Sequence, residues 1–242
     1  MRFIRLREEI IMEQENTNGF TLNGIRHEEL YEGTGVGMSM YNLVMGGLVL
    51  YGIIANIIIC LTCTKFALSI NPLVLIIGYI VLVLAGTVML HHTKSNALRF
   101  VGYNMVVIPL GLVLSVVIES YGGMSAAVVH QAFIYTVIIT AVMVMLSVAF
   151  PSFFSKIGSM LLGCLLGMLI AYIVLWIFHI DTIMIAYFGA ALFSLYIGYD
   201  FWKSQQYPKT FGNAIISACE IYLDIINLFL YLLRIFGKSD NK

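Results

Sequence analysis

The chain alternates between long apolar stretches and short polar joints. Seven of the stretches reach the roughly 17–25 residues that a helix needs to cross a bilayer. They cover residues 40–63, 72–92, 98–119, 126–150, 157–178, 182–200 and 213–235. The joints contain turn-forming residues, as in "SINP", "SYGGMS" and "QQYPKTFG". This pattern predicts an all-α polytopic membrane protein, built as a bundle of seven transmembrane helices.

The composition agrees with a protein that faces lipid. Of the 242 residues, 60% are hydrophobic and 11% are charged, whereas soluble domains carry roughly a quarter charged residues. The formal net charge is zero, so no basic surface argues for nucleic acid. We therefore expect the lipid bilayer as the main partner and no nucleic acid.

Charge and polarity also divide the chain and orient it. Residues 1–38 are polar and rich in glutamate, which predicts a flexible cytosolic tail. We expect the transmembrane domain to cover 39–237 and a C-terminal tail to cover 238–242. Lys and Arg favour the N-terminal side of the membrane by nine to four, or by six to four without the three arginines nearest the start. This bias predicts a cytosolic N-terminus and an external C-terminus.

Polar residues interrupt the last apolar stretch at a regular spacing. Separated by 3, 4, 3, 4 and 3 positions, they are Ser217, Glu220, Asp224, Asn227, Tyr231 and Arg234. This spacing puts all six on one face of a helix. Because a charge in the bilayer core costs about 2.5–3.5 kcal/mol on insertion scales, we expect this face to contact protein or water. Arg234 is expected to reach the outer interface.

Asp200, at the end of the sixth stretch, is the expected partner of Asp224. The sixth and seventh stretches form an antiparallel hairpin, in which residues equidistant from the turn lie at the same depth. The midpoint between positions 200 and 224 is Gly212, in the turn "QQYPKTFG". The midpoint between 200 and 220 also falls in this turn, so Glu220 stays as a competitor one helical turn nearer the cytosol.

Two carboxylates in contact share a proton and titrate as one unit. When both are ionised they repel each other or attract a cation, and oxygen clusters suit hard cations such as Ca²⁺. Asp200, Asp224, Glu220 and Asn227 are therefore predicted to form a pH-sensing site in an ion pathway. We expect no catalytic residue, no resident metal and no cofactor, with Ca²⁺ as a permeant or transiently bound ion.

Four segments of the chain carry a recognisable signature. They are "SLYIGYD", which ends at Asp200, "IYLDIINLFLYLLRIFG", which contains Asp224, "HQAFIYT" and "SFFSKIGSMLLGCLLGMLIA". They resemble the Bax inhibitor-1 (transmembrane Bax inhibitor motif) family over residues 40–237. The resemblance implies a seven-helix bundle with a cytosolic N-terminus, a di-aspartyl pair at Asp200 and Asp224, and a pH-sensitive calcium leak. We expect a multi-pass protein of a bacterial cell membrane.

The chain departs from the family pattern at two places. Bacterial members have a run of arginines where the second stretch ends, and this chain has "MLHHTKSN" there. His91, His92 and Lys94 are the candidate gating charges at that end, although histidine charge fades near neutral pH. Arg234 is a candidate gating charge at the other end of the bundle. Glu220 stands where an apolar or small residue is more usual.

Three functions fit these residues. The first is a pH-sensitive cation leak, and the second is a non-conducting regulator that binds other membrane proteins, such as a membrane protease. The third is an intramembrane aspartyl protease, which the missing glycines argue against, because the second aspartate follows "IYL" and not a GxG motif. We therefore expect no enzyme, and a monomer or weak oligomer.

The cysteines and two stripes of small residues are expected to serve helix packing. Cys60 and Cys63 form a CxxC, which has no second Cys or His pair nearby to support a metal and reads as packing. Two stripes of small residues follow helical spacing, which favours close helix packing in lipid. The stripes are Ser159, Gly163, Gly167 and Ala171 in the fifth stretch and Ala186, Ala190, Ser194 and Gly198 in the sixth.

Overall fold

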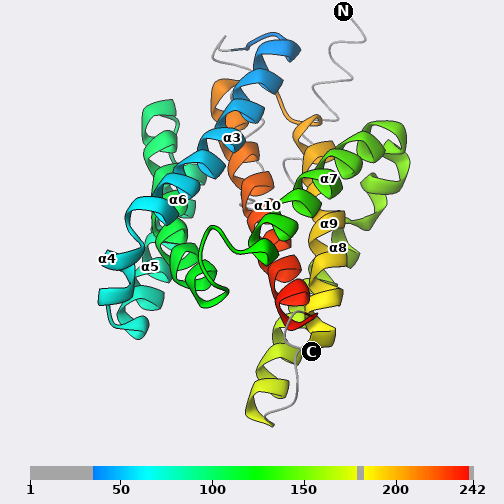
Figure 1. The fold of residues 1–242 in the computed structure, drawn as a ribbon. Coiled ribbons are helices and arrows are strands. Elements are labelled where there is room, and N and C mark those ends of the chain that lie inside the picture. The colour runs from blue at the N-terminus through cyan, green and yellow to red at the C-terminus, as the bar shows by residue number, and fades with distance from the viewer. Residues whose placement is uncertain (1–34, 179–182, 240–242) are drawn as a thin grey trace, which may run out of the picture.

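The computed structural model describes residues 35–178 and 183–239, and within them the regular elements are helices (Figure 1). The helices are α3 (Met38–Thr62), α4 (Thr64–Ser69), α5 (Pro72–His92), α6 (Asn96–Ser120), α7 (Ala127–Ala149), α8 (Pro151–Ile177), α9 (Ile183–Ser204) and α10 (Phe211–Ser239). Among the described residues, seven helices are long and apolar enough to cross a membrane. This confirms the predicted all-α, multi-pass membrane architecture. Residues 1–34 of the expected tail lie outside the described residues.

The helix boundaries differ from the apolar stretches where a local signal overrides hydropathy. The segment "FPSFFSK" reads as a turn, yet α8 begins at Pro151, because a proline at the first helical position needs no N–H partner. The joint after the first stretch contains the short helix α4. Helix α10 extends to Ser239, which includes two residues that the sequence assigned to the C-terminal tail.

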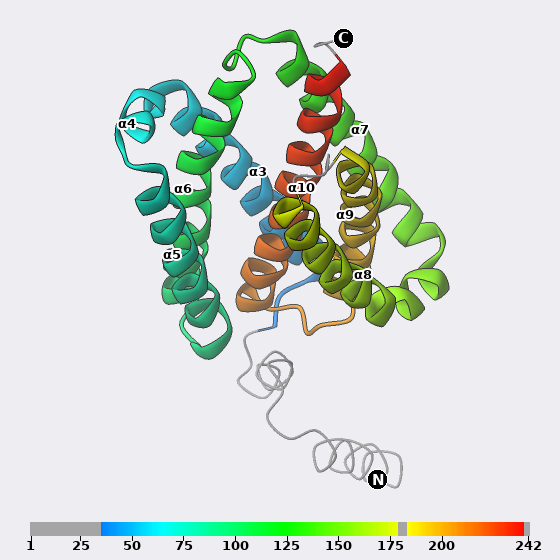
Figure 2. The same cartoon turned by 90° about the horizontal axis from the view of Figure 1, so that it is seen from below.

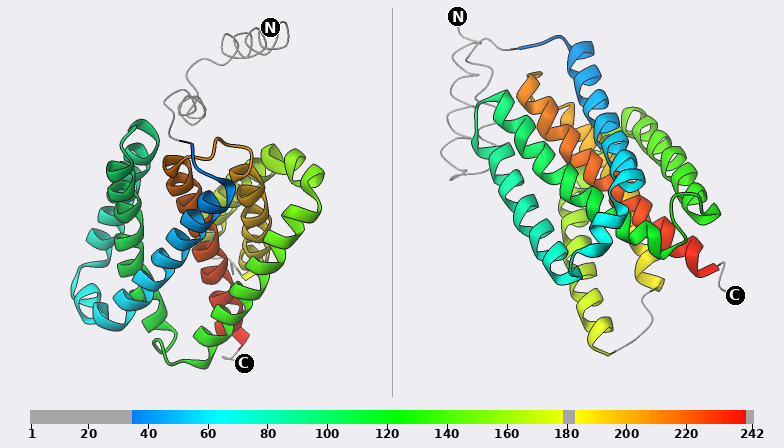
Figure 3. Two further views of the ribbon diagram at one scale, coloured as in Figure 1. Left: turned by 90° about the horizontal axis from the view of Figure 1, so that it is seen from above. Right: turned by 60° about the vertical axis from the view of Figure 1, so that its left-hand side comes forward.

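Helix α10 is the centre of the molecule (Figures 2 and 3). It packs against α3, α5 and α6 on one side and against α7 and α9 on another. Of its most apolar 18-residue window, 72% is buried, the highest share among the described spans. The sequence predicted one protein-facing side for this helix, and the structure encloses nearly all of it.

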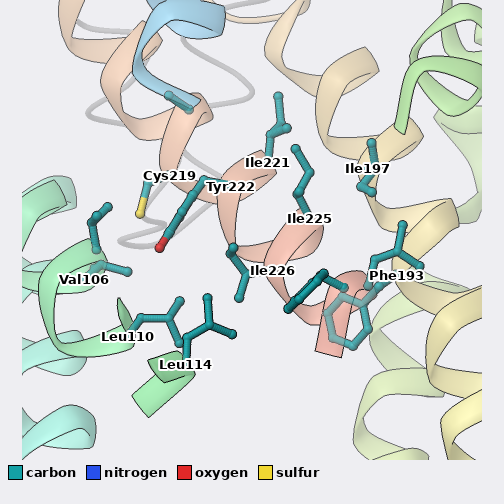
Figure 4. Close-up of a cluster of buried hydrophobic side chains, with 14 of the residues drawn as sticks. Val106, Leu110, Leu114, Phe193, Ile197, Cys219, Ile221, Tyr222, Ile225 and Ile226 are labelled. Carbon is teal, nitrogen blue, oxygen red and sulfur yellow. The ribbon is translucent and has the colours of Figure 1, made fainter. Parts of the chain in front are cut away.

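The other helices form two groups that meet at α10. The first group is α3–α6, in which α6 packs against α3, α4 and α5, and the second group is α7–α9, in which α9 packs against α7 and α8. In the described part of the chain, helices of different groups make at most marginal contact with each other, and both groups pack against α10. Figure 4 shows Tyr222 and Ile226 of α10 on the side of α6, and Phe193 and Ile197 of α9 on the other side. The apolar core is therefore arranged around α10.

The two stripes of small residues have different surroundings. In α9, Ala186 is fully buried and Gly198 lies under the ring of Phe154, so close that an added Cβ would be 2.4 Å from a ring carbon. In α8, Gly163 and Gly167 have nothing within 4 Å of an added Cβ. The α9 stripe therefore packs as expected, whereas these two glycines of α8 face open space.

Candidate functional site

The structure brings Asp200 and Asp224 together across α9 and α10. Asp200 lies one turn before the end of α9, and Asp224 lies at the middle of α10. The two carboxyl groups are within hydrogen-bonding reach of each other, and both residues are buried, with exposed fractions of 9% and 7%. Among the described residues, the Oδ2 atom of Asp224 has no hydrogen-bond partner. The hairpin argument from the sequence therefore placed the two residues correctly.

A lysine accompanies the carboxyl groups. The Nζ atom of Lys203 lies 3.9 Å from Oδ1 of Asp200 and 3.6 Å from Oε1 of Glu220, so it bridges α9 and α10. In the sequence, Lys203 is one of the nine Lys and Arg residues on the expected cytosolic side and is not singled out as part of the site. Its position three residues after Asp200, on the same face of α9, was the available signal.

The remaining residues of the polar face of α10 also contact protein, mostly on the side of α8 and α9. The Nδ2 atom of Asn227 donates to the Leu223 carbonyl at 2.8 Å within its own helix. The Tyr231 hydroxyl lies 3.8 Å from the sulfur of Met168, and the Arg234 guanidinium lies 6.0 Å from the ring centre of Tyr172. Because Arg234 is ten residues after Asp224, the two are about 15 Å apart along the helix. Arg234 is thus remote from the carboxyl pair.

A second set of contacts closes the bundle where α3 begins and α9 joins α10. The Tyr41 hydroxyl donates to the Ser204 carbonyl at 3.0 Å and lies 3.2 Å from Oγ of Ser217, the first residue of the polar face. The Nζ atom of Lys209 lies 4.7 Å from the ring centre of Tyr41. It donates to three backbone carbonyls at the end of α9, those of Ser204, Gln205 and Tyr207. Burial lowers the pKa of Lys209 from its ordinary value of 10.5.

The structure does not bring the candidate gating charges of α5 into contact with the pair. The Nδ1 atoms of His91 and His92 lie 2.9 and 3.1 Å from carbonyls of their own helix, those of Thr87 and Val88. Lys94 follows in the exposed joint before α6. The positive charge beside Asp200 comes instead from Lys203, on the same helix.

The opposite face of α10 carries a separate polar contact. The Asn56 amide of α3 donates to the Tyr222 hydroxyl, and Cys60 lies one turn further along α3, with its sulfur 3.9 Å from the Gly111 carbonyl. Cys60 is buried and Cys63 is partly exposed, and both are free thiols. Among the described residues, no group of three or more His, Cys, Asp and Glu side chains is placed to hold a metal ion.

Comparison with known protein families shows the family to which the chain belongs. The model of the family described as "Inhibitor of apoptosis-promoting Bax1" matches residues 34–241, which is most of the chain. The protein belongs to the Bax inhibitor-1 family. The match includes all seven spans, the hairpin with Asp200 and Asp224, and the bridging Lys203. The resemblance found in the sequence is therefore confirmed for this Bax inhibitor-1 family member over a slightly longer range.

The carboxyl groups of Asp200 and Asp224 are placed so that they can bind a proton or a cation. Two carboxyl groups within hydrogen-bonding reach hold one proton between them, and the loss of that proton leaves two negative charges in a buried place. Glu220 adds a third carboxylate on the side of Lys203. In this Bax inhibitor-1 family member, any ionised form of the buried pair requires a nearby cation, and Lys203 is placed beside it.

Proposed function

We propose that this protein is a pH-sensitive cation leak, with Ca²⁺ as the physiological ion, in which Asp200 and Asp224 sense protons. The observation that supports it is the buried contact of the two carboxyl groups across α9 and α10. Protonated, the pair holds the two helices together by a hydrogen bond. Deprotonated, it separates them or attracts a hard cation, for which carboxylate oxygens are the preferred ligands.

Three further groups define the route by which a cation reaches the pair. Lys203 and Glu220 lie between the pair and the side of the membrane where α9 ends, and each is partly exposed. A cation from that side meets Glu220 first and displaces the ammonium group of Lys203. Asn227 lies one turn beyond Asp224 and continues the polar face of α10. The pathway thus follows α10 along its polar side.

The test is calcium flux into liposomes that contain the purified protein and a calcium-sensitive dye, measured over a range of pH. We expect flux that rises with pH in the wild type. Asp200→Asn and Asp224→Asn are each expected to abolish the pH dependence, and the double variant adds little, because the two residues act as one unit. Glu220→Gln is expected to have a smaller effect.

A matched control compares the effect of losing a carboxylate of the pair with that of losing a carboxylate elsewhere. Glu119 is exposed and lies near the C-terminal end of α6, on the other side of the membrane from the end of α9. Glu119→Gln is therefore expected to leave the pH profile unchanged. Independent effects of the two Asn variants, or a pH response carried by Glu220, would show that the wrong pair has been named. Absence of flux at every pH, together with co-purification of another membrane protein, would favour a non-conducting regulator.

A further inference from the structure

A long apolar crevice lies on the other side of α10 from the carboxyl pair. Its walls are α3, over residues 49–60, and α7, over residues 129–141, and its floor is made by α6 and α10. Its volume is about 510 Å³. It exists because α3 and α7 belong to different groups and make at most marginal contact in the described part of the chain. Figure 1 shows these two helices on either side of α10.

The crevice opens sideways into the lipid. Leu50 of α3 and Phe133 and Val137 of α7 line it, with exposed fractions of 60%, 44% and 52%. Its wall residues lie in the second half of α3 and the first half of α7. The crevice is therefore in the half of the membrane nearer the end of α10, where the surrounding medium is hydrocarbon.

The length, the apolar lining and the sideways opening of the crevice favour an acyl chain as its occupant. Eleven residue steps along α3 correspond to about 16 Å, which is about half the thickness of the hydrocarbon core of a bilayer. One leaflet supplies that half, so a single acyl chain that enters from the leaflet matches the length of the crevice.

The polar groups around the crevice do not favour water. A buried water requires 2–4 polar partners. The Thr136 hydroxyl already donates to the Ala132 carbonyl at 2.8 Å, and the Asn56 amide already donates to Tyr222. The Oδ1 atom of Asn56 and the hydroxyl of Thr140 have no hydrogen-bond partner among the described residues, but both atoms are buried and neither is presented to the crevice. The Asn56 Oδ1 atom faces Gly111, lying 2.6 Å from where a Cβ on that glycine would be. The rest of the surface is almost entirely apolar side chains.

We propose that this crevice binds an acyl chain of a membrane phospholipid, from the leaflet nearer the end of α10. The chain lies along α3 and α7 and contacts Ile225 and Ile226, which follow Asp224 on α10. The headgroup lies toward His130, an exposed crevice residue near the start of α7. The lipid fills the gap between the two helix groups and is a structural component of the bundle. The inference does not depend on ion conduction.

The experiment measures the lipid that stays on the purified protein. After exchange into a mild detergent, native mass spectrometry is expected to show the wild type with one phospholipid per chain. Val137→Trp fills the mouth of the crevice and is expected to reduce the bound fraction at least about tenfold. Leu84→Trp is the matched control, because Leu84 is 62% exposed on α5, outside the crevice, and it is expected to retain the lipid.

A second measurement keeps the proposal testable if Val137→Trp fails to fold. A phosphatidylcholine with a photoreactive diazirine in its acyl chain is added to the wild type before the detergent exchange. We expect cross-links within 49–60 and 129–141 that survive the exchange, and cross-links on α5 that do not. Loss of the crevice cross-links together with those on α5, or equal lipid retention by Val137→Trp and Leu84→Trp, would overturn the proposal.

Discussion

The carboxyl pair and its lysine show how a buried charge is supported at the scale of single residues. Asp224 lies at the middle of a spanning helix, where an unpaired charge is costly. Its neighbours are Asp200, whose carboxyl group is within hydrogen-bonding reach, and beyond it Lys203 and Glu220, which pair across the two helices. Glu220, unusual for the family pattern, thus has a local counter-charge. The positive charge beside the pair belongs to a lysine of α9, and the candidate gating charges of α5 do not contact it.

Lys203→Met tests this replacement. A nearby positive charge favours the ionised form of a carboxylate, so without the ammonium group a higher pH is needed to ionise the pair. We expect the midpoint of calcium flux to move to higher pH. Lys156→Met is the control, because Lys156 is exposed on α8. An equal shift in both variants would mean that surface charge in general, and not the contact with Asp200, sets the midpoint.

Lys209→Met tests the closure at the end of α9. Loss of hydrogen bonds from a charged donor to backbone carbonyls costs about 1.5–3 kcal/mol in the free energy of unfolding. Because burial lowers the pKa of Lys209 below 10.5, the unfolded chain keeps this proton to higher pH than the folded one. The contribution of Lys209 to stability therefore rises as pH rises through the folded pKa toward 10.5.

Thermal unfolding in detergent measures both effects of Lys209. The melting temperature of Lys209→Met should fall below that of the wild type by roughly 2–4 °C for each kcal/mol lost. The difference between the two proteins should grow as pH rises toward 10.5. A difference that shrinks over this interval would contradict the sign derived from burial.

At the scale of the helices, small residues matter where a neighbouring ring fills the space beside them. Gly189 of α9 lies against the ring of Tyr231 of α10, so that an added Cβ would be 2.6–2.8 Å from three ring carbons. The same ring stacks on Phe193 at 5.7 Å between centres. Gly167 of α8 has nothing comparable. Spacing alone identified the α8 and α9 stripes equally, and only the structure separates them.

Gly189→Leu and Gly167→Leu form a matched pair of substitutions. Overpacking at Gly189 forces the Tyr231 ring to move and is expected to cost about 1–3 kcal/mol, which lowers the melting temperature by several degrees. Gly167→Leu adds an apolar side chain to a lipid-facing surface and should leave the melting temperature within error. Equal losses would show that the α8 face is also packed in the purified protein.

The sequence predicted the spans and the carboxyl pair. It did not predict the central position of α10 or the place of Lys203 beside the pair, and each of these outcomes has a physical reason. Hydropathy identifies a spanning helix by length, and the midpoint at Gly212 fixes which residues of a hairpin meet. Hydropathy does not distinguish a face that contacts lipid from one that contacts protein, since both are apolar, so the central position of α10 was not predictable. Lys203 was missed because it lies beyond the apolar stretch, in what reads as a joint.

At the scale of the whole molecule, seven described spans place the two ends of the transmembrane domain on opposite sides of the membrane. The distribution of Lys and Arg predicts that the N-terminus is cytosolic. A reporter enzyme that is active only outside the cytosol, fused after Lys242, is therefore expected to be active. A reporter that requires the cytosol, fused at the same place, should be inactive, and the reverse result would invert the topology.

The central position of α10 also bears on how the protein is made. Translation proceeds from the N-terminus, and early parts of a chain fold first, yet α10, the helix that joins the two groups, follows both of them in the chain. Until α10 is inserted, the faces of α3–α6 and α7–α9 that pack against it lack their partner. Insertion of α10 therefore brings the two groups together. A premature stop before Phe211 would therefore leave the two groups connected by the joint between α6 and α7 but without the helix against which both of them pack.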